Sequence, residues 1–65
     1  MKILLNGEER EVNAARLSEV LVELGFAGAT IATAVNGDFV PAAERTNTEL
    51  AEGDRLEVVA PQQGG

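Results

Sequence analysis

Residues 17–24 read Leu-Ser-Glu-Val-Leu-Val-Glu-Leu, and this stretch is the clearest helix of the sequence. Its first, fourth, fifth and eighth residues are apolar, and the spacing i, i+3, i+4, i+7 places them on one face of an α-helix. We expect a helix of about three turns, with Asn13 as its N-cap and Gly25 as the left-handed residue that ends it. The single apolar face needs a second layer to cover it.

The segment before the helix predicts a β-hairpin. Residues 1–5 form a short apolar run, and Asn6-Gly7 is a strong hairpin-turn signal because both residues tolerate positive φ. A second strand over residues 9–13 is charged around a single apolar residue, Val12, which is typical of a solvent-facing edge.

A second hairpin is expected after the helix. Residues 30–35 indicate a buried strand, which Asn36-Gly37 ends, and Phe39-Val40 follows as a short apolar piece up to Pro41.

The chain then returns to the sheet for a last strand. A polar turn region over residues 44–52 carries Leu50 as its anchor into the core. Gly53-Asp54 turns the chain into residues 55–60, where apolar and charged residues alternate.

The order ββαβ(β)β in so short a chain predicts an α+β fold, a β-grasp (ubiquitin-like) fold with a mixed four- to five-stranded sheet and one helix packed on one face. The first and last strands are expected side by side at its centre. We predict a single domain over residues 1–60 and a flexible Gly-Gly tail over residues 61–65. Besides the helical stripe, the expected core comprises Ile3, Leu5, Phe26, Leu50, Leu56 and Val58.

Composition argues against an enzyme. The 65 residues include no cysteine and no histidine, and we expect no metal site and no catalytic residue. Eleven acidic against five basic residues give a formal charge of −6, which disfavours nucleic acid and membrane surfaces and favours a partner with a basic docking surface. Without a signal or membrane segment, the expectation is a cytoplasmic monomer.

The pair Gly64-Gly65 is the feature best suited to chemistry. Two residues without Cβ can pass through a channel too narrow for any side chain, and five extended residues reach at most about 17 Å. A carboxylate delivered in this way must first be activated, for example as an acyl-adenylate. The chain has no phosphate-binding Gly-rich loop, so we expect a partner to bind the ATP and this chain to bind no cofactor.

Along its whole length the sequence resembles the ThiS family, the sulfur carriers of thiamine biosynthesis. The positions that carry the resemblance are Ile3, Asn6-Gly7, Leu17, Leu21, Leu24, residues 34–37, Val40-Pro41, Leu50, Gly53-Asp54, residues 56–58 and Gly64-Gly65.

The resemblance implies that Gly65 is adenylated by a ubiquitin-activating-like enzyme and converted to a thiocarboxylate. It also implies that a sulfur-donating protein of the cysteine desulfurase type supplies the sulfur and that thiazole synthase consumes it. Gly64 would be the spacer, and Gln63 and Gln62 would enter the partner's active site with it.

Two departures leave the pathway open. The family commonly has an aromatic residue where this chain has residues 42–45, and its tail seldom carries a proline at the position of Pro61. The stretch from Ala60 to the Gly-Gly end is closer to MoaD, the small subunit of molybdopterin synthase. A molybdopterin sulfur donor, a ubiquitin-like protein modifier and a plain interaction module are therefore alternatives.

A docking surface is also expected near the last strand. Leu4 and Val59 have the strand phase opposite to the core, and the acidic Glu57 and Asp54 lie close to them in the sequence. These four residues form the predicted docking surface, against the simpler interpretation of an ordinary wet surface.

Overall fold

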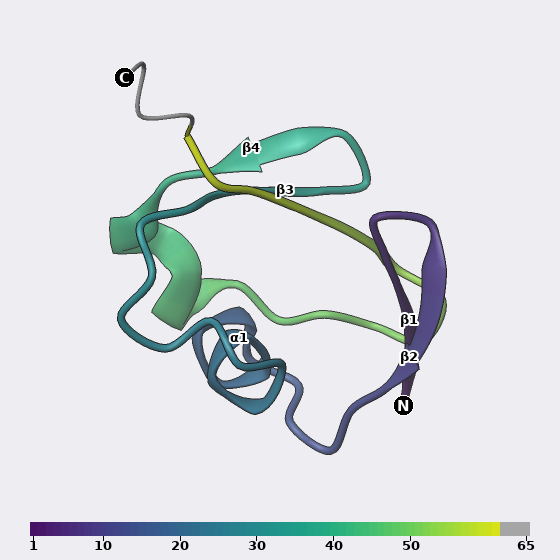
Figure 1. The fold of residues 1–65 in the computed structure, drawn as a ribbon. Helices are drawn as coiled ribbons and strands as arrows, with labels where there is room; N and C mark the ends of the chain where they lie inside the picture. Colours follow the sequence, from purple (N-terminus) through teal and green to yellow (C-terminus); the bar gives the residue numbers. More distant parts are fainter. Residues whose placement is uncertain (62–65) are drawn as a thin grey trace.

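The computed structural model describes residues 1–61 and shows a five-stranded mixed sheet with one α-helix across one face (Figure 1). The strands are β1 (Lys2–Leu5), β2 (Glu8–Glu11), β3 (Ala32–Val35), β4 (Asp38–Val40) and β5 (Arg55–Val59), the α-helix is α1 (Leu17–Glu23), and a 3₁₀ helix is η1 (Ala42–Asn47). The strand order β2-β1-β5-β3-β4, with β1 and β5 parallel and every other pair antiparallel, confirms the predicted β-grasp fold.

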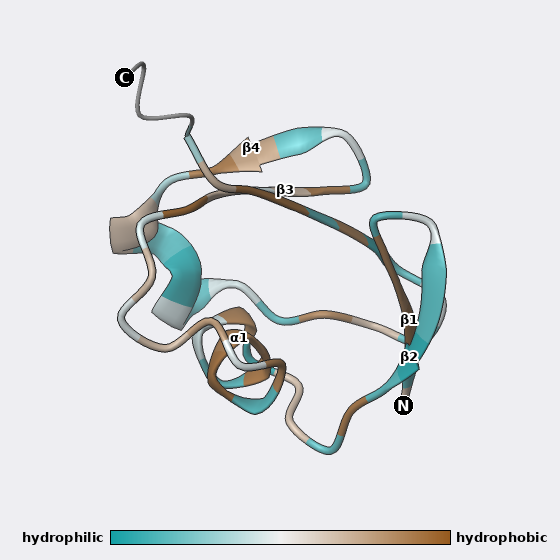
Figure 2. Cartoon of the chain, in the orientation of Figure 1, coloured by the Kyte–Doolittle hydropathy of each residue, from teal (hydrophilic) through white to brown (hydrophobic). Residues whose placement is uncertain are grey.

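Both predicted hairpin turns are confirmed. Asn6 and Asn36 have φ of 50° and 51°, and the glycines that follow them both have φ of 89°. Positive φ at both central residues matches the right-handed twist of the flanking strands. β2 is an edge strand with all four residues exposed, and Figure 2 shows its hydrophilic colouring.

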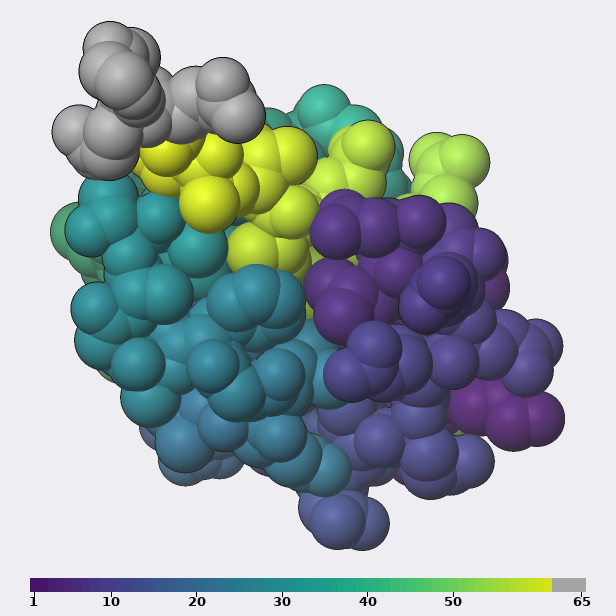
Figure 3. Space-filling model, viewed as in Figure 1, coloured from purple at the N-terminus to yellow at the C-terminus, as the bar shows by residue number. Residues whose placement is uncertain are grey.

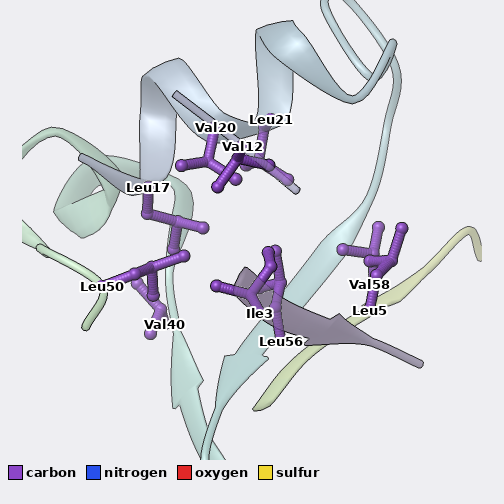
Figure 4. Close-up of a cluster of buried hydrophobic side chains, with 10 residues drawn as sticks. All are labelled: Ile3, Leu5, Val12, Leu17, Val20, Leu21, Val40, Leu50, Leu56 and Val58. Atoms are coloured by element: carbon purple, nitrogen blue, oxygen red, sulfur yellow. The ribbon is translucent and has the colours of Figure 1, made fainter. Parts of the chain in front are cut away.

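The core lies between α1 and the inner face of the sheet (Figure 4). Leu17 and Val20 from the helix and Leu56 from β5 are fully buried. Leu50 is buried as predicted, and Phe26 packs against the edge of the cluster. The other buried apolar residues are Ile3, Leu5, Val12, Leu21, Val40 and Val58.

The helix begins later than predicted, and the expected Asn13 cap is wrong. Arg16 is the N-cap and its side chain makes no capping bond, so α1 has seven residues, about two turns rather than three. The main-chain N–H of Leu17, which has no partner within the helix, donates to the carbonyl of Thr48 at 2.8 Å instead. A tertiary contact therefore replaces the local cap.

Other element boundaries also differ from expectation. β2 ends at Glu11, two residues before the predicted end, and β5 ends at Val59. The strand predicted from residue 30 begins at Ala32, and in it only Thr33 is fully buried. The first part of the polar region expected to be a turn, residues 44–47, lies in the 3₁₀ helix η1, and Arg45 of that helix donates to the carbonyl of Ile31 at 2.8 Å.

Removing a central core side chain should unfold much of the population. Leu17→Ala is expected to cost about 2–5 kcal/mol, while a domain of this size commonly holds only about 3–5 kcal/mol in total. Val22→Ala removes an apolar group that is 61% exposed and should change stability by less than about 0.5 kcal/mol. Urea unfolding followed by circular dichroism compares the two, and equal losses would contradict the packing described above.

Glu23 should make the fold sensitive to acid. Its carboxylate accepts the N–H groups of Ala14 and Asn13 at 2.8–3.0 Å, and these hydrogen bonds hold the pKa of Glu23 below its usual range. The resulting stabilisation is present above the unfolded-state pKa and is lost as pH falls through the lower folded-state pKa.

Glu23→Gln should therefore lower the melting temperature at neutral pH and flatten its decline in acid. Thermal melts between about pH 6 and pH 3 measure both effects. Glu19→Gln, on the same helix, controls for loss of one charge. A Glu23→Gln curve parallel to that of the unsubstituted protein throughout this range would be the contrary result.

Candidate functional site

The C-terminal end of β5 lies at the surface of the described part of the chain. β5 is the central strand, and its C-terminal end lies in view beside the chain around residue 30 and the N-terminal hairpin (Figure 3). Ala60 and Pro61 follow it and are exposed. The predicted tail residues Gln62, Gln63, Gly64 and Gly65 lie outside the described residues.

The backbone just before this exit is held from both sides. On one side Thr33 pairs with Val58 and Ala32 with Val59 in the antiparallel register of β3 and β5. On the other side the Asn6 amide contacts Val58, whose N–H donates to Oδ1 at 2.9 Å and whose carbonyl accepts from Nδ2 at 3.1 Å. Val58 is therefore a fixed point from which the chain leaves the sheet.

The face of the sheet opposite the helix carries an apolar patch near this exit. Val59 and Phe39 are 60% and 68% exposed. The strand registers place Ala32 beside Val59 and Ala34 beside Phe39, so the four side chains lie on one face. Together with Glu57 they line a shallow hollow. We call Ala32, Ala34, Phe39 and Val59 the open-face patch.

The four residues of the predicted docking surface do not all lie together in the structure. Glu57 and Val59 lie at the open-face patch. Leu4 is half-buried and pairs with Arg55 at the start of β5, four residues and therefore about 13 Å along the strand from Val59. Leu4 and Val59 thus lie near opposite ends of β5.

Asp54 has a structural role that the sequence interpretation did not foresee. Its carboxylate accepts the N–H of Ala51 at 2.8 Å and the Nδ2 of Asn36 at 3.1 Å. Asp54 is half-buried, and these bonds hold it in the turn that leads into β5.

Phe39 is the surface residue that the sequence interpretation missed. Grouping Phe39 with Val40 as one short apolar piece overlooks that neighbouring residues of a strand point to opposite faces. Val40 is buried in the core, so Phe39 must face outward. The alternation was the available signal, and it places one of the chain's two phenylalanines in solvent.

The described residues offer little other chemistry. Across residues 1–61, no cluster of three or more His, Cys, Asp or Glu side chains is arranged to hold a metal ion. The same residues contain no helix long and apolar enough to cross a membrane.

Sequence and structure comparisons agree on the family. The sequence matches the ThiS family over residues 3–65. The chain belongs to the ThiS family. It is 38% identical over 63 residues to the sulfur carrier protein ThiS of Thermus thermophilus, covering 97% of this chain and 98% of the relative.

Two further relatives complete the comparison. The chain is 38% identical over 66 residues to a thiazole synthase of Paramagnetospirillum magneticum, and it spans only 20% of that protein's length. The crystal structure of the thiamine biosynthesis protein ThiS from Geobacter metallireducens superimposes with a TM-score of 0.83 at 26% identity, and each chain is fully covered.

Proposed function

We propose that this chain, a sulfur carrier of the ThiS family, carries sulfur as a thiocarboxylate on Gly65 and donates it for thiazole formation in thiamine biosynthesis. The observation that supports this most directly is the position of β5. The central strand ends at the surface beside the open-face patch, and the sequence that follows Pro61 ends in Gly64-Gly65. The folded domain then provides the surface that partners bind, and the tail provides the residue that carries the sulfur.

The chemistry must be supplied by partners. A carboxylate oxygen of Gly65 attacks the α-phosphorus of ATP in an adenylating enzyme, and pyrophosphate leaves. The terminal sulfur of a persulfide, carried by a donor of the cysteine desulfurase type, then attacks the carbonyl carbon and displaces AMP. A thiol cleaves the resulting S–S bond, which releases the thiocarboxylate and leaves a disulfide. One C–O bond is exchanged for one C–S bond, and this chain acts as a carrier and not as a catalyst.

The open-face patch is the proposed docking surface for these partners. Large exposed apolar side chains such as Phe39 and Val59 are typical anchors of a protein interface. Glu57 beside them and the net charge of −6 favour a partner whose apolar contact surface has a basic rim.

Thiazole synthase is the proposed acceptor. The match to the ThiS family over residues 3–65 and the similarity to part of a thiazole synthase both support the thiamine pathway over the molybdopterin alternative.

Sulfur loading is tested by intact-protein mass spectrometry. After incubation with ATP, the cognate adenylating enzyme and a sulfur donor, the mass should rise by the difference between one sulfur and one oxygen atom. Deleting Gly65 should abolish the increment, while the circular dichroism spectrum and melting temperature stay unchanged. An unaltered mass with a demonstrably active enzyme would refute the proposal.

Docking is tested by two substitutions in the open-face patch. Phe39→Ser and Val59→Ser should each raise the KM of the adenylating enzyme for the carrier about tenfold, because an apolar anchor is lost. Val22→Ser is the matched control, since Val22 is 61% exposed but lies on α1. If Phe39→Ser and Val59→Ser gave the same KM as Val22→Ser, the open-face patch would not be the docking surface.

A further inference from the structure

The two Asn-Gly turns have a second feature in common besides their backbone angles. In both, the asparagine side chain bonds to the backbone of β5. Asn36 accepts the N–H of Arg55 at 2.9 Å, at the beginning of β5. Asn6 bonds to Val58, near the end of β5 and three residues before Pro61. The two turns therefore hold opposite ends of the same strand.

Asn6 takes the place of a missing strand residue. β1 pairs with β5 at Leu4 and Leu5, and the N–H of Asn6 still donates to the carbonyl of Leu56 at 2.9 Å. Its positive φ of 50° then turns the backbone away from β5. The side-chain amide, with one donor and one acceptor aimed at Val58, supplies the two bonds that main-chain groups of a longer β1 would have made.

The residues after Val58 extend this rigidity toward the tail. Val59 is paired with Ala32 of β3. The ring of Pro61 fixes its own φ, and its bulk restricts Ala60 to extended conformations. Residues 58–61 thus form a stiff base whose direction depends on how firmly Val58 is held.

We propose that Asn6 is a positioning residue for sulfur loading: its amide fixes Val58 and so sets the direction in which the tail leaves the sheet. This inference rests on the proposed function. A partner that meets residues 58–61 already ordered does not have to fix them itself. Loss of that order is expected to slow a reaction that depends on accurate placement of the reacting group.

The alternative role for Asn6 is stability alone, and Asn36 is the control for it. Both residues occupy the same turn type, precede a glycine and bond to β5, but only Asn6 lies at the tail end. Glycine tolerates the positive φ at either position. Asn6→Gly and Asn36→Gly therefore keep the turn and remove only the side-chain bonds.

The test measures the kinetics of sulfur loading with the cognate adenylating enzyme. Asn6→Gly should lower kcat about fivefold with KM for the carrier within about twofold, because the open-face patch is kept and the delivery of Gly65 is not. Asn36→Gly should keep both constants within about twofold of the unsubstituted protein. Melting temperatures of the two variants show whether their losses of stability are comparable.

Amide hydrogen exchange provides a readout that needs no partner. Exchange at Val58, whose N–H donates to Asn6, should become faster in Asn6→Gly and remain slow in Asn36→Gly. Unchanged exchange in Asn6→Gly, or equal kcat values for the two variants, would overturn the role of Asn6 even if loading of the unsubstituted protein succeeds. If that loading itself fails, the proposed function fails and the positioning role fails with it, whatever the exchange shows.

Discussion

The parallel pairing of β1 with β5 is the contact on which the rest of the structure depends. Leu4 beside Arg55 and Leu5 beside Leu56 join the beginning of the chain to its last strand. Without this pairing, the β1–β2 hairpin and the β3–β4 hairpin would have no common sheet. The same pairing gives α1 a continuous apolar face to cover, and it places β5, the strand from which the tail leaves, at the centre of the sheet.

The two faces of the sheet have separate tasks because so small a domain can cover only one of them. Thr33 and Val58 face inward, while their neighbours Ala34 and Val59 face outward. The inner face supplies stability and the outer face leaves apolar side chains in solvent. Burial of that outer face therefore depends on a partner, which is consistent with a protein that other enzymes hold.

The sequence predicted those features whose signals are local. The apolar stripe of α1, the positive φ after each strand at Asn6 and Asn36, and the charged edge strand all follow from residue type and spacing. The start of α1 could not be predicted in this way. Asn13 was the best local cap, but its own N–H is bound by Glu23 at the other end of the helix. The carbonyl of Thr48, from a distant segment, accepts the N–H of Leu17 where the helix begins.

The candidate site was predictable to different degrees. Gly65 was proposed from the terminal Gly-Gly pair together with the absence of cysteine and histidine, and it lies outside the described residues. Phe39 required strand alternation to be applied to a piece of three residues, β4, too short for a clear pattern. The contact of the Asn6 amide with Val58 joins residues 52 positions apart, and no spacing rule applies at that separation.

The central position of β5 has a consequence for the order in which the chain folds. Contacts between distant parts of a chain form slowly and late, because the closure of a long loop precedes any gain from them. The sheet cannot be completed until Arg55–Val59 is in place. A chain broken off within that strand would lack the middle of its fold and would offer partners no finished surface. In this fold, a molecule that has completed its sheet therefore already has residues 58–61, the base of the tail, in place.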